Sequence, residues 1–144
     1  MGKERNLNLL TSERGASWLS GLFTMLVLTI VIFIGIEVAC YLSSYWKLRV
    51  ACSETLALMK IENGFDAQIK QCFDSFLKVQ GLDPHQDRVK VVGTAKTVQR
   101  GEVVTIRTEM PYTFRALKPL GKEFHLTIRV AMSGLAQEFI KQKN

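Results

Sequence analysis

The sequence predicts an α+β fold, in which a long N-terminal transmembrane helix continues into a small domain with a second helix and a three-stranded antiparallel sheet. The first observation is an uncharged run from Gly15 to Ile36. The second is the segment from Tyr41 to Glu62, which contains neither Gly nor Pro. The third is the alternation of apolar and polar residues beyond residue 88, which is the period of a half-buried strand.

Residues 15–46 are predicted to form one membrane-spanning helix. At about 1.5 Å per residue, the uncharged run is about as long as the hydrocarbon core of a bilayer is thick. Its centre, Met25–Ile36, is mostly apolar on all sides, whereas a surface helix of a soluble protein has a polar side. The alternative is a cleaved secretory signal peptide, whose apolar core is shorter, roughly 7–15 residues. Residues 1–14 form a short polar leader. Because a single apolar span follows it, we expect a single-pass protein of the cell membrane.

Residues 47–64 are predicted to extend this helix beyond the membrane. Ala, Leu, Met, Lys and Glu, which favour helix, are frequent here. Asn63-Gly64 is a typical helix end. An apolar stripe recurs at i, i+4, i+8 and i+11, and we expect it to be exposed and to form a subunit contact: Leu48, Cys52, Leu56 and Met59.

Residues 65–144 are predicted to form the folded α+β domain. Its helix is expected over Phe65–Gln80, with an apolar face that carries several aromatic residues: Phe65, Ile69, Cys72, Phe73, Phe76 and Leu77. We expect Phe73 and Phe76 to pack under the sheet against Ile128 or Val130, because no other large apolar surface faces them.

Three strands are expected over residues 88–98, 104–114 and 124–132, with a turn at residues 99–102. Short connections between them favour an antiparallel meander. Pro111 lacks a backbone donor, so it predicts either a bulge or a free edge at that point of the second strand.

Glu37 is the one ionisable residue near the far end of the apolar span. A carboxylate there is costly unless it reaches water or is paired with a cation. Two interpretations stay open: an interfacial side chain in contact with water, or a subunit contact with a positive group of a neighbouring chain.

The composition offers no motif for catalysis or for cofactor binding. The chain has 19 Lys and Arg against 13 Asp and Glu, but the cations are scattered, so no nucleic-acid partner is expected. His85 lies near Asp83 and Asp87 in a predicted loop, where turn chemistry explains the carboxylates. No phosphate-binding loop, metal-ligand spacing or small-molecule site is recognisable. We therefore expect no enzyme, no cofactor and no metal.

The three cysteines are Cys40, Cys52 and Cys72. They form no CxxC pair. A disulfide between Cys52 and Cys72 is sterically feasible if two helices fold back on each other. Small buried thiols are the simpler interpretation, and we favour it.

The apolar run is preceded by Arg14-Gly15-Ala16-Ser17, and it ends with Gly35-Ile36-Glu37. With the long helix and the small sheet, this layout resembles type IV pilins and pseudopilins, and in particular the TadE-like minor pilins of tight-adherence systems. The far half is similar to uncharacterised pilin-like proteins of Gram-positive mobile elements, through a further set of residues: Tyr112, Pro119-Leu120-Gly121, Phe124–Val130, Ala131 and Gly134.

The resemblance implies a minor pilin-like structural subunit of a type IV pilus, tight-adherence, conjugation or secretion-type assembly. It also implies processing between Gly15 and Ala16, an extracytoplasmic C-terminal domain, and other pilin-like subunits or assembly-platform proteins as partners besides membrane lipid. The chain departs from the pattern at Ser20, where pilins carry a Glu that neutralises the amino terminus of a neighbour. The alternative function is a membrane-anchored binding or adaptor module that does not polymerise.

Overall fold

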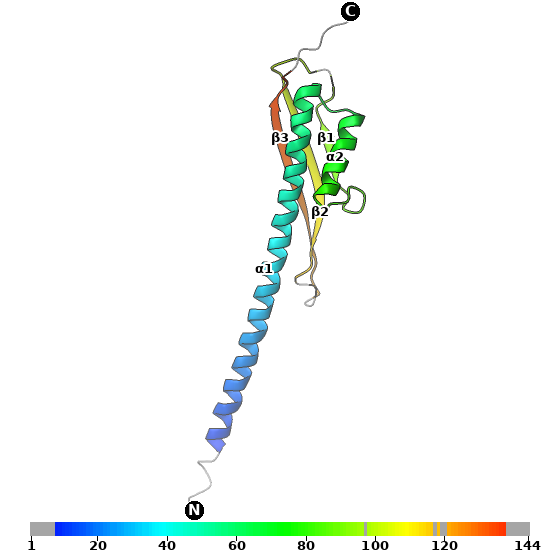
Figure 1. Ribbon diagram of the computed structural model, residues 1–144. Coiled ribbons are helices and arrows are strands. Elements are labelled where there is room, and N and C mark those ends of the chain that lie inside the picture. Colours follow the sequence, from blue (N-terminus) through cyan, green and yellow to red (C-terminus); the bar gives the residue numbers. More distant parts are fainter. Residues whose placement is uncertain (1–7, 97, 117, 119–120, 138–144) are drawn as a thin grey trace, which may run out of the picture.

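The computed structural model describes residues 8–96, 98–116, 118 and 121–137, with side chains from residue 17 onward. It has the predicted α+β layout (Figure 1). The elements follow one another as two helices and then three strands: α1 (Asn8–Glu62), α2 (Ala67–Val79), β1 (Lys90–Gly93), β2 (Val103–Phe114) and β3 (Phe124–Leu135).

Helix α1 is a single helix of 55 residues, about 80 Å long. It starts at Asn8, so the second half of the polar leader is helical, which the sequence did not predict. This segment contains no Gly or Pro before Gly15, so nothing in it interrupts the helix. The helix ends as predicted, because Asn63 and Gly64 adopt positive φ angles of 57° and 139°.

The three strands form an antiparallel sheet in the order β1-β2-β3. Between β2 and β3 the register runs from Val103 opposite Leu135 to Phe114 opposite Phe124, and these described strands contain no bulge. β1 pairs with β2 only from Ile106 to Glu109, so Pro111 lies beyond β1 on a free edge. Of the two interpretations of Pro111, the edge is therefore right.

β1 is much shorter than the predicted strand over residues 88–98. It begins after Arg88, which has a φ of 51°, and it ends at Gly93. There the chain leaves the ladder to reach Phe65, whose backbone N–H donates to the carbonyl of Thr94 at 2.7 Å. A Cβ on Gly93 would lie 2.5 Å from the Phe65 side chain, so this approach requires glycine. The expected turn at residues 99–102 is present, with Glu102 N donating to Gln99 O at 3.0 Å.

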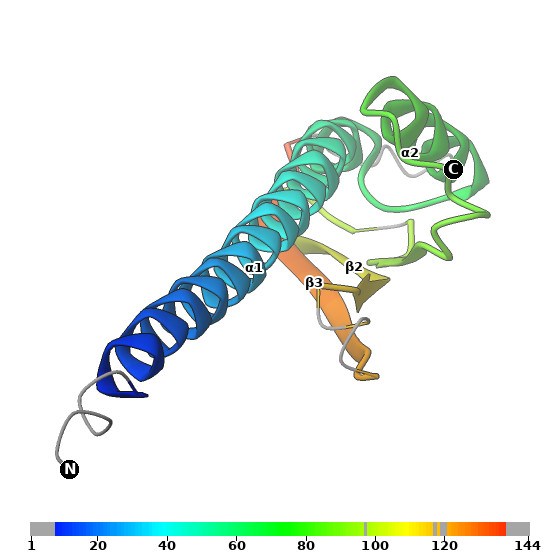
Figure 2. The same ribbon diagram turned by 90° about the horizontal axis from the view of Figure 1, so that it is seen from below.

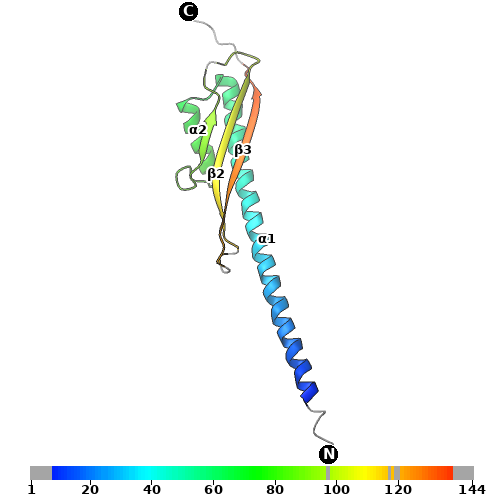
Figure 3. The same cartoon turned by 180° about the vertical axis from the view of Figure 1, so that it is seen from behind.

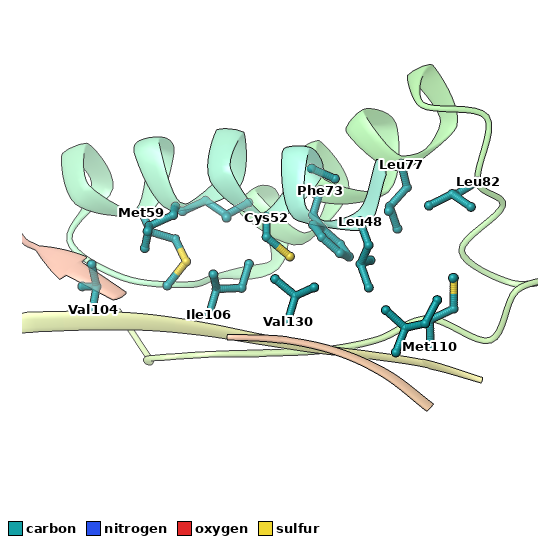
Figure 4. Close-up of a cluster of buried hydrophobic side chains, with 14 of the residues drawn as sticks. Leu48, Cys52, Met59, Phe73, Leu77, Leu82, Val104, Ile106, Met110 and Val130 are labelled. Atoms are coloured by element: carbon teal, nitrogen blue, oxygen red, sulfur yellow. The ribbon is translucent and has the colours of Figure 1, made fainter. Parts of the chain in front are cut away.

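Both helices lie on the same face of the sheet (Figures 2 and 4). The hydrophobic core lies between the two helices and the sheet, and it contains the α1 stripe. It also contains the inward residues of α2 and of the strands, among them Ile69, Phe73, Leu77, Val104, Ile106, Met110, Ile128 and Val130. Phe73 is 1% exposed, which confirms its predicted burial, whereas Phe76 is only partly buried and packs against the core. Direct packing of the two rings against Ile128 or Val130 stays a prediction.

The prediction that the α1 stripe is exposed for a subunit contact is wrong. Leu48, Cys52 and Met59 are fully buried, and Leu56 is 4% exposed. Figure 4 shows the side chains of Leu48, Cys52 and Met59 pointing from α1 toward the sheet. The physical reason is that the sheet has a large apolar face, and its own helix is the closest surface that can cover it.

All three cysteines are free. Cys52 lies 3.1 Å from the hydroxyl of Thr108, a buried polar residue on the inward face of β2. This confirms the interpretation of Cys52 as a small buried thiol. Cys40 is exposed and Cys72 is intermediate, so burial does not extend to all three.

Replacing Phe73 with Ala should lower the free energy of unfolding by about 3–5 kcal/mol, because the truncation leaves a cavity in the core. Urea unfolding of the full chain in detergent micelles, followed by circular dichroism, measures the change. Val79→Ala on the same helix is the control, since Val79 is 81% exposed. Equal effects of the two substitutions would contradict the assigned core.

Candidate functional site

The most distinctive polar contact of the molecule joins the apolar, exposed half of α1 to the tip of the β2–β3 hairpin. β2 and β3 have 12 residues each, whereas β1 has four. The hairpin therefore extends past the core and runs back along α1 toward its N-terminus (Figures 1 and 3). This brings residues near 112–115 beside Glu37.

Glu37 accepts a hydrogen bond on each carboxylate oxygen. The Tyr112 hydroxyl donates to Oε2 at 2.8 Å, and the backbone N–H of Arg115 donates to Oε1 at 3.2 Å. The Tyr112 ring also packs edge-on against Tyr41, one helical turn above Glu37, with centroids 5.4 Å apart. Glu37 and Tyr112 are 75 residues apart in the sequence, so this contact fixes the hairpin against α1 at long range.

Burial of the hydroxyl, and next the hydrogen bond to Glu37, raise the pKa of Tyr112 to about 12. Both effects favour the protonated phenol, which is the form that donates to the carboxylate. Since the pKa in the unfolded chain is near 10, the linked loss of stability sets in as the pH rises past about 10 and continues to about 12. The contact therefore stays intact throughout the neutral pH range.

The structure gives Glu37 partners that neither interpretation of the sequence included. Two donors to its carboxylate belong to its own chain. Tyr112 lies in the strand that the sequence predicted over residues 104–114, but no local pattern links that residue to Glu37. A role of Glu37 in a subunit contact stays a prediction.

A cleft of about 780 Å³ opens beside this contact. It lies between α1, the loop from α2 to β1, and the hairpin. Its lining combines apolar side chains with charged ones and a histidine, namely Glu37, Asp87, Arg88, Arg115 and His125. Within the part of the chain that the structure describes, no group of three or more His, Cys, Asp or Glu residues is placed to hold a metal ion.

The carboxylates around His85 serve the turn that connects α2 with β1. Asp83 Oδ1 accepts from the backbone N–H groups of His85 at 2.8 Å and Gln86 at 3.1 Å. The bond from Gln86, and then that from His85, hold the pKa of Asp83 below its ordinary value. Asp87 Oδ2 accepts from the backbone of Asp83 at 2.8 Å. Turn chemistry thus accounts for both carboxylates, as the sequence predicted.

The predicted processing residues Gly15 and Ala16 lie within α1, between its bounds of Asn8 and Glu62. Their side chains lie outside the described residues. Processing at this peptide bond stays a prediction.

Tyr112→Phe should lower the free energy of unfolding by about 1 kcal/mol or more, because it removes a donor to a charged acceptor. Tyr41→Phe is the matched control, since it also removes a hydroxyl but leaves the Tyr112–Glu37 bond and the ring contact in place. Urea unfolding in detergent compares the two variants. If they lose equal stability, the Tyr112–Glu37 bond does not fix the hairpin.

Comparison with known proteins gives one family. The family described as a domain of unknown function, DUF4320, matches residues 22–141, a range that begins inside α1 and includes α2 and the whole sheet. No curated protein and no solved structure gives a significant match to the chain. Since the match covers well over half of the sequence, the chain belongs to the DUF4320 family.

Proposed function

We propose that this protein is a membrane-anchored, pilin-like structural subunit of the minor pseudopilin type. The observation that carries the proposal is the two-part surface of α1. One half of this continuous helix is apolar and exposed, and the other half is the core of an α+β domain. Pilin-like subunits need such a helix, because it holds them in the membrane before assembly and packs among neighbouring helices afterwards.

The exposed half of α1 supports an anchoring role. Among the residues that the structure describes, one helix is long and apolar enough to cross a membrane. Large apolar side chains are exposed along it, including Trp18 at 75%, Met25 at 71% and Leu26 at 59%. Such a continuous apolar surface requires lipid or other apolar helices around it. The same surface serves both states of a subunit, before and after assembly.

The other half of α1 limits where subunits meet. Because the stripe that contains Leu48 and Met59 is used inside the domain, contacts between subunits fall to the exposed half of α1 and to outer surfaces of the domain. The outer face of the sheet carries Val103 and Leu135, which lie opposite each other and are both 57% exposed. This pair offers an apolar contact on the outer face of the sheet.

The partners that fit this proposal are membrane lipid and other pilin-like subunits or assembly-platform proteins. We place the C-terminal domain outside the cytoplasm, at the end of a single membrane span. Protease added to intact cells should then degrade the domain. Protection of the domain in intact cells, with cleavage after lysis, would reverse this orientation.

A second candidate is a membrane-anchored binding or adaptor module of a secretion or conjugation apparatus that does not polymerise. The specific observation in its favour is that both oxygens of Glu37 are satisfied within the chain. Ser20 also stands at the position where pilins carry the Glu that meets a neighbour's amino terminus. The span therefore contains no carboxylate that requires a neighbouring chain.

A photocrosslinking amino acid at Leu26 should link the full chain to further copies or to related subunits in cells that assemble it. Leu26 is the test position because it lies on the exposed apolar half of α1. The same amino acid at Gln71, exposed on α2, is the control for surface proximity in general. Adducts should be recovered from the sheared extracellular fraction as a ladder of increasing mass.

The adaptor function predicts a different result. The chain would then be missing from the sheared fraction, and Leu26 would give no ladder. That outcome would contradict the proposal of a structural subunit, and it would leave the membrane anchor in place.

A further inference from the structure

The tip of the β2–β3 hairpin lies beside the last turns of the uncharged span. A groove of about 440 Å³ separates the two, with Phe33, Ile36 and Glu37 on the α1 side and Arg115, Ala116 and Lys118 on the hairpin side. Phe33 and Ile36 are each 54% exposed. The groove is therefore open, and one of its walls is formed by the half of α1 that we propose to span the membrane.

This position coincides with the headgroup layer of a bilayer that α1 spans. From Phe33 to Glu37 the helix rises about 6 Å. The headgroup layer on each side of the hydrocarbon core is about 5–8 Å thick. A hairpin tip that contacts α1 at this height has to lie among the headgroups.

The tip carries an excess of positive charge. Arg115, Lys118 and Lys122 stand against one carboxylate, Glu123, in residues 115–123. The ion pair between Lys118 and Glu123, at 3.3 Å, is exposed, with 66% and 40% of the two side chains accessible. Water and salt weaken such a pair, so Lys118 remains available to an external anion.

Of the described residues that line the groove, Glu37 is the one acidic residue, and its carboxylate is already bound by the hairpin. Both of its oxygens accept hydrogen bonds from the hairpin, one from Tyr112 and one from the Arg115 backbone. Its carboxylate therefore points from α1 to the hairpin and holds the tip in place. The cations Arg115 and Lys118 belong to the hairpin side of the groove.

The strand next to the tip presents apolar side chains to the same region. Phe124 and Leu126 are 48% and 44% exposed, whereas Ile128 and Val130, on the same face of β3, are buried. The apolar face of β3 therefore extends beyond the part that the helices cover. An apolar strand end beside a basic loop matches an anionic phospholipid, whose negatively charged headgroup lies above apolar chains.

From these contacts we propose that the groove binds the phosphate of an anionic phospholipid, with Arg115 and Lys118 of its lining as the cationic ligands. Lys122, which is exposed in the same connection between β2 and β3, adds positive charge beside them. This inference rests on the proposed membrane anchor. The bound lipid gives the domain a second point of contact with the membrane besides α1. The angle between the domain and the membrane surface is therefore fixed. The lipid chains lie along Phe33 and Ile36, and Phe124 and Leu126 face the same lipid.

The test uses the full chain extracted in mild detergent from membranes that contain phosphatidylcholine and phosphatidylglycerol in equal amounts. Native mass spectrometry counts the lipids that stay bound. The wild-type chain should retain phosphatidylglycerol several-fold over phosphatidylcholine. The triple variant Arg115→Gln/Lys118→Gln/Lys122→Gln should lose this preference.

The control is Lys70→Gln/Lys78→Gln/Lys90→Gln, which removes the same charge from exposed positions on α2 and at the start of β1. It should retain the wild-type preference, as should the charge-conserving variant Arg115→Lys/Lys118→Arg/Lys122→Arg. Equal retention of phosphatidylglycerol in both glutamine variants would overturn the site. Displacement of the lipid by an equal concentration of soluble glycerol phosphate would overturn the lipid as its ligand.

A wash of the membranes at alkaline pH separates this inference from the anchor itself. The triple variant should stay in the membrane, since α1 is unchanged. If the wild-type chain is washed off, the membrane anchor fails. If it stays but shows no lipid preference, only the hairpin site fails.

Discussion

The fold depends on the burial of one stripe of α1 under the sheet. Leu48, Cys52, Thr55 and Met59 are among the largest fully buried side chains, and all four belong to this helix. A sheet with one apolar face has to bury that face against another element. Here α1 provides much of the cover, with α2 beside it. The domain is therefore built around the same element that is exposed and apolar over its other half.

This arrangement couples the domain to the anchor without a linker. α1 contains no break between its exposed half and its buried half, so the orientation of the sheet follows that of the helix. The contact of Glu37 with Tyr112 adds a second connection, near the membrane end of the domain. A hairpin held at its tip and along its length cannot swing away from α1 without breaking this bond. Such rigidity is compatible with the proposed function as a structural subunit.

The sequence was sufficient for features that depend on local pattern. The long helix follows from residues that favour helix and from the lack of Gly and Pro between Tyr41 and Glu62, and its end follows from Asn63-Gly64. The alternation in β2 likewise predicted which residues point inward. Periodicity shows which face of an element is buried, but it does not show what covers that face. For this reason the stripe on α1 was assigned to another chain instead of to the chain's own sheet.

The features that the sequence did not reveal depend on long-range contacts. β1 is short because Gly93 has to approach Phe65, a residue that precedes α2. The partners of Glu37 lie 75 and 78 residues away, and nothing near Glu37 in the sequence indicates them. The sequence identified Glu37 as a group that requires a partner, because a carboxylate beside an apolar span is costly. Only the arrangement of the hairpin shows that the partner is internal.

Hydrogen–deuterium exchange of the full chain in lipid nanodiscs tests the central claim, that one unbroken helix is both membrane anchor and domain core. The account predicts slow exchange without a gap from Ser17, in the apolar half, to Met59, at the end of the buried stripe. Lipid protects the first part and the sheet protects the second. A rapidly exchanging segment between Glu37 and Leu48 would contradict the account, because it would separate the anchor from the core by a flexible joint.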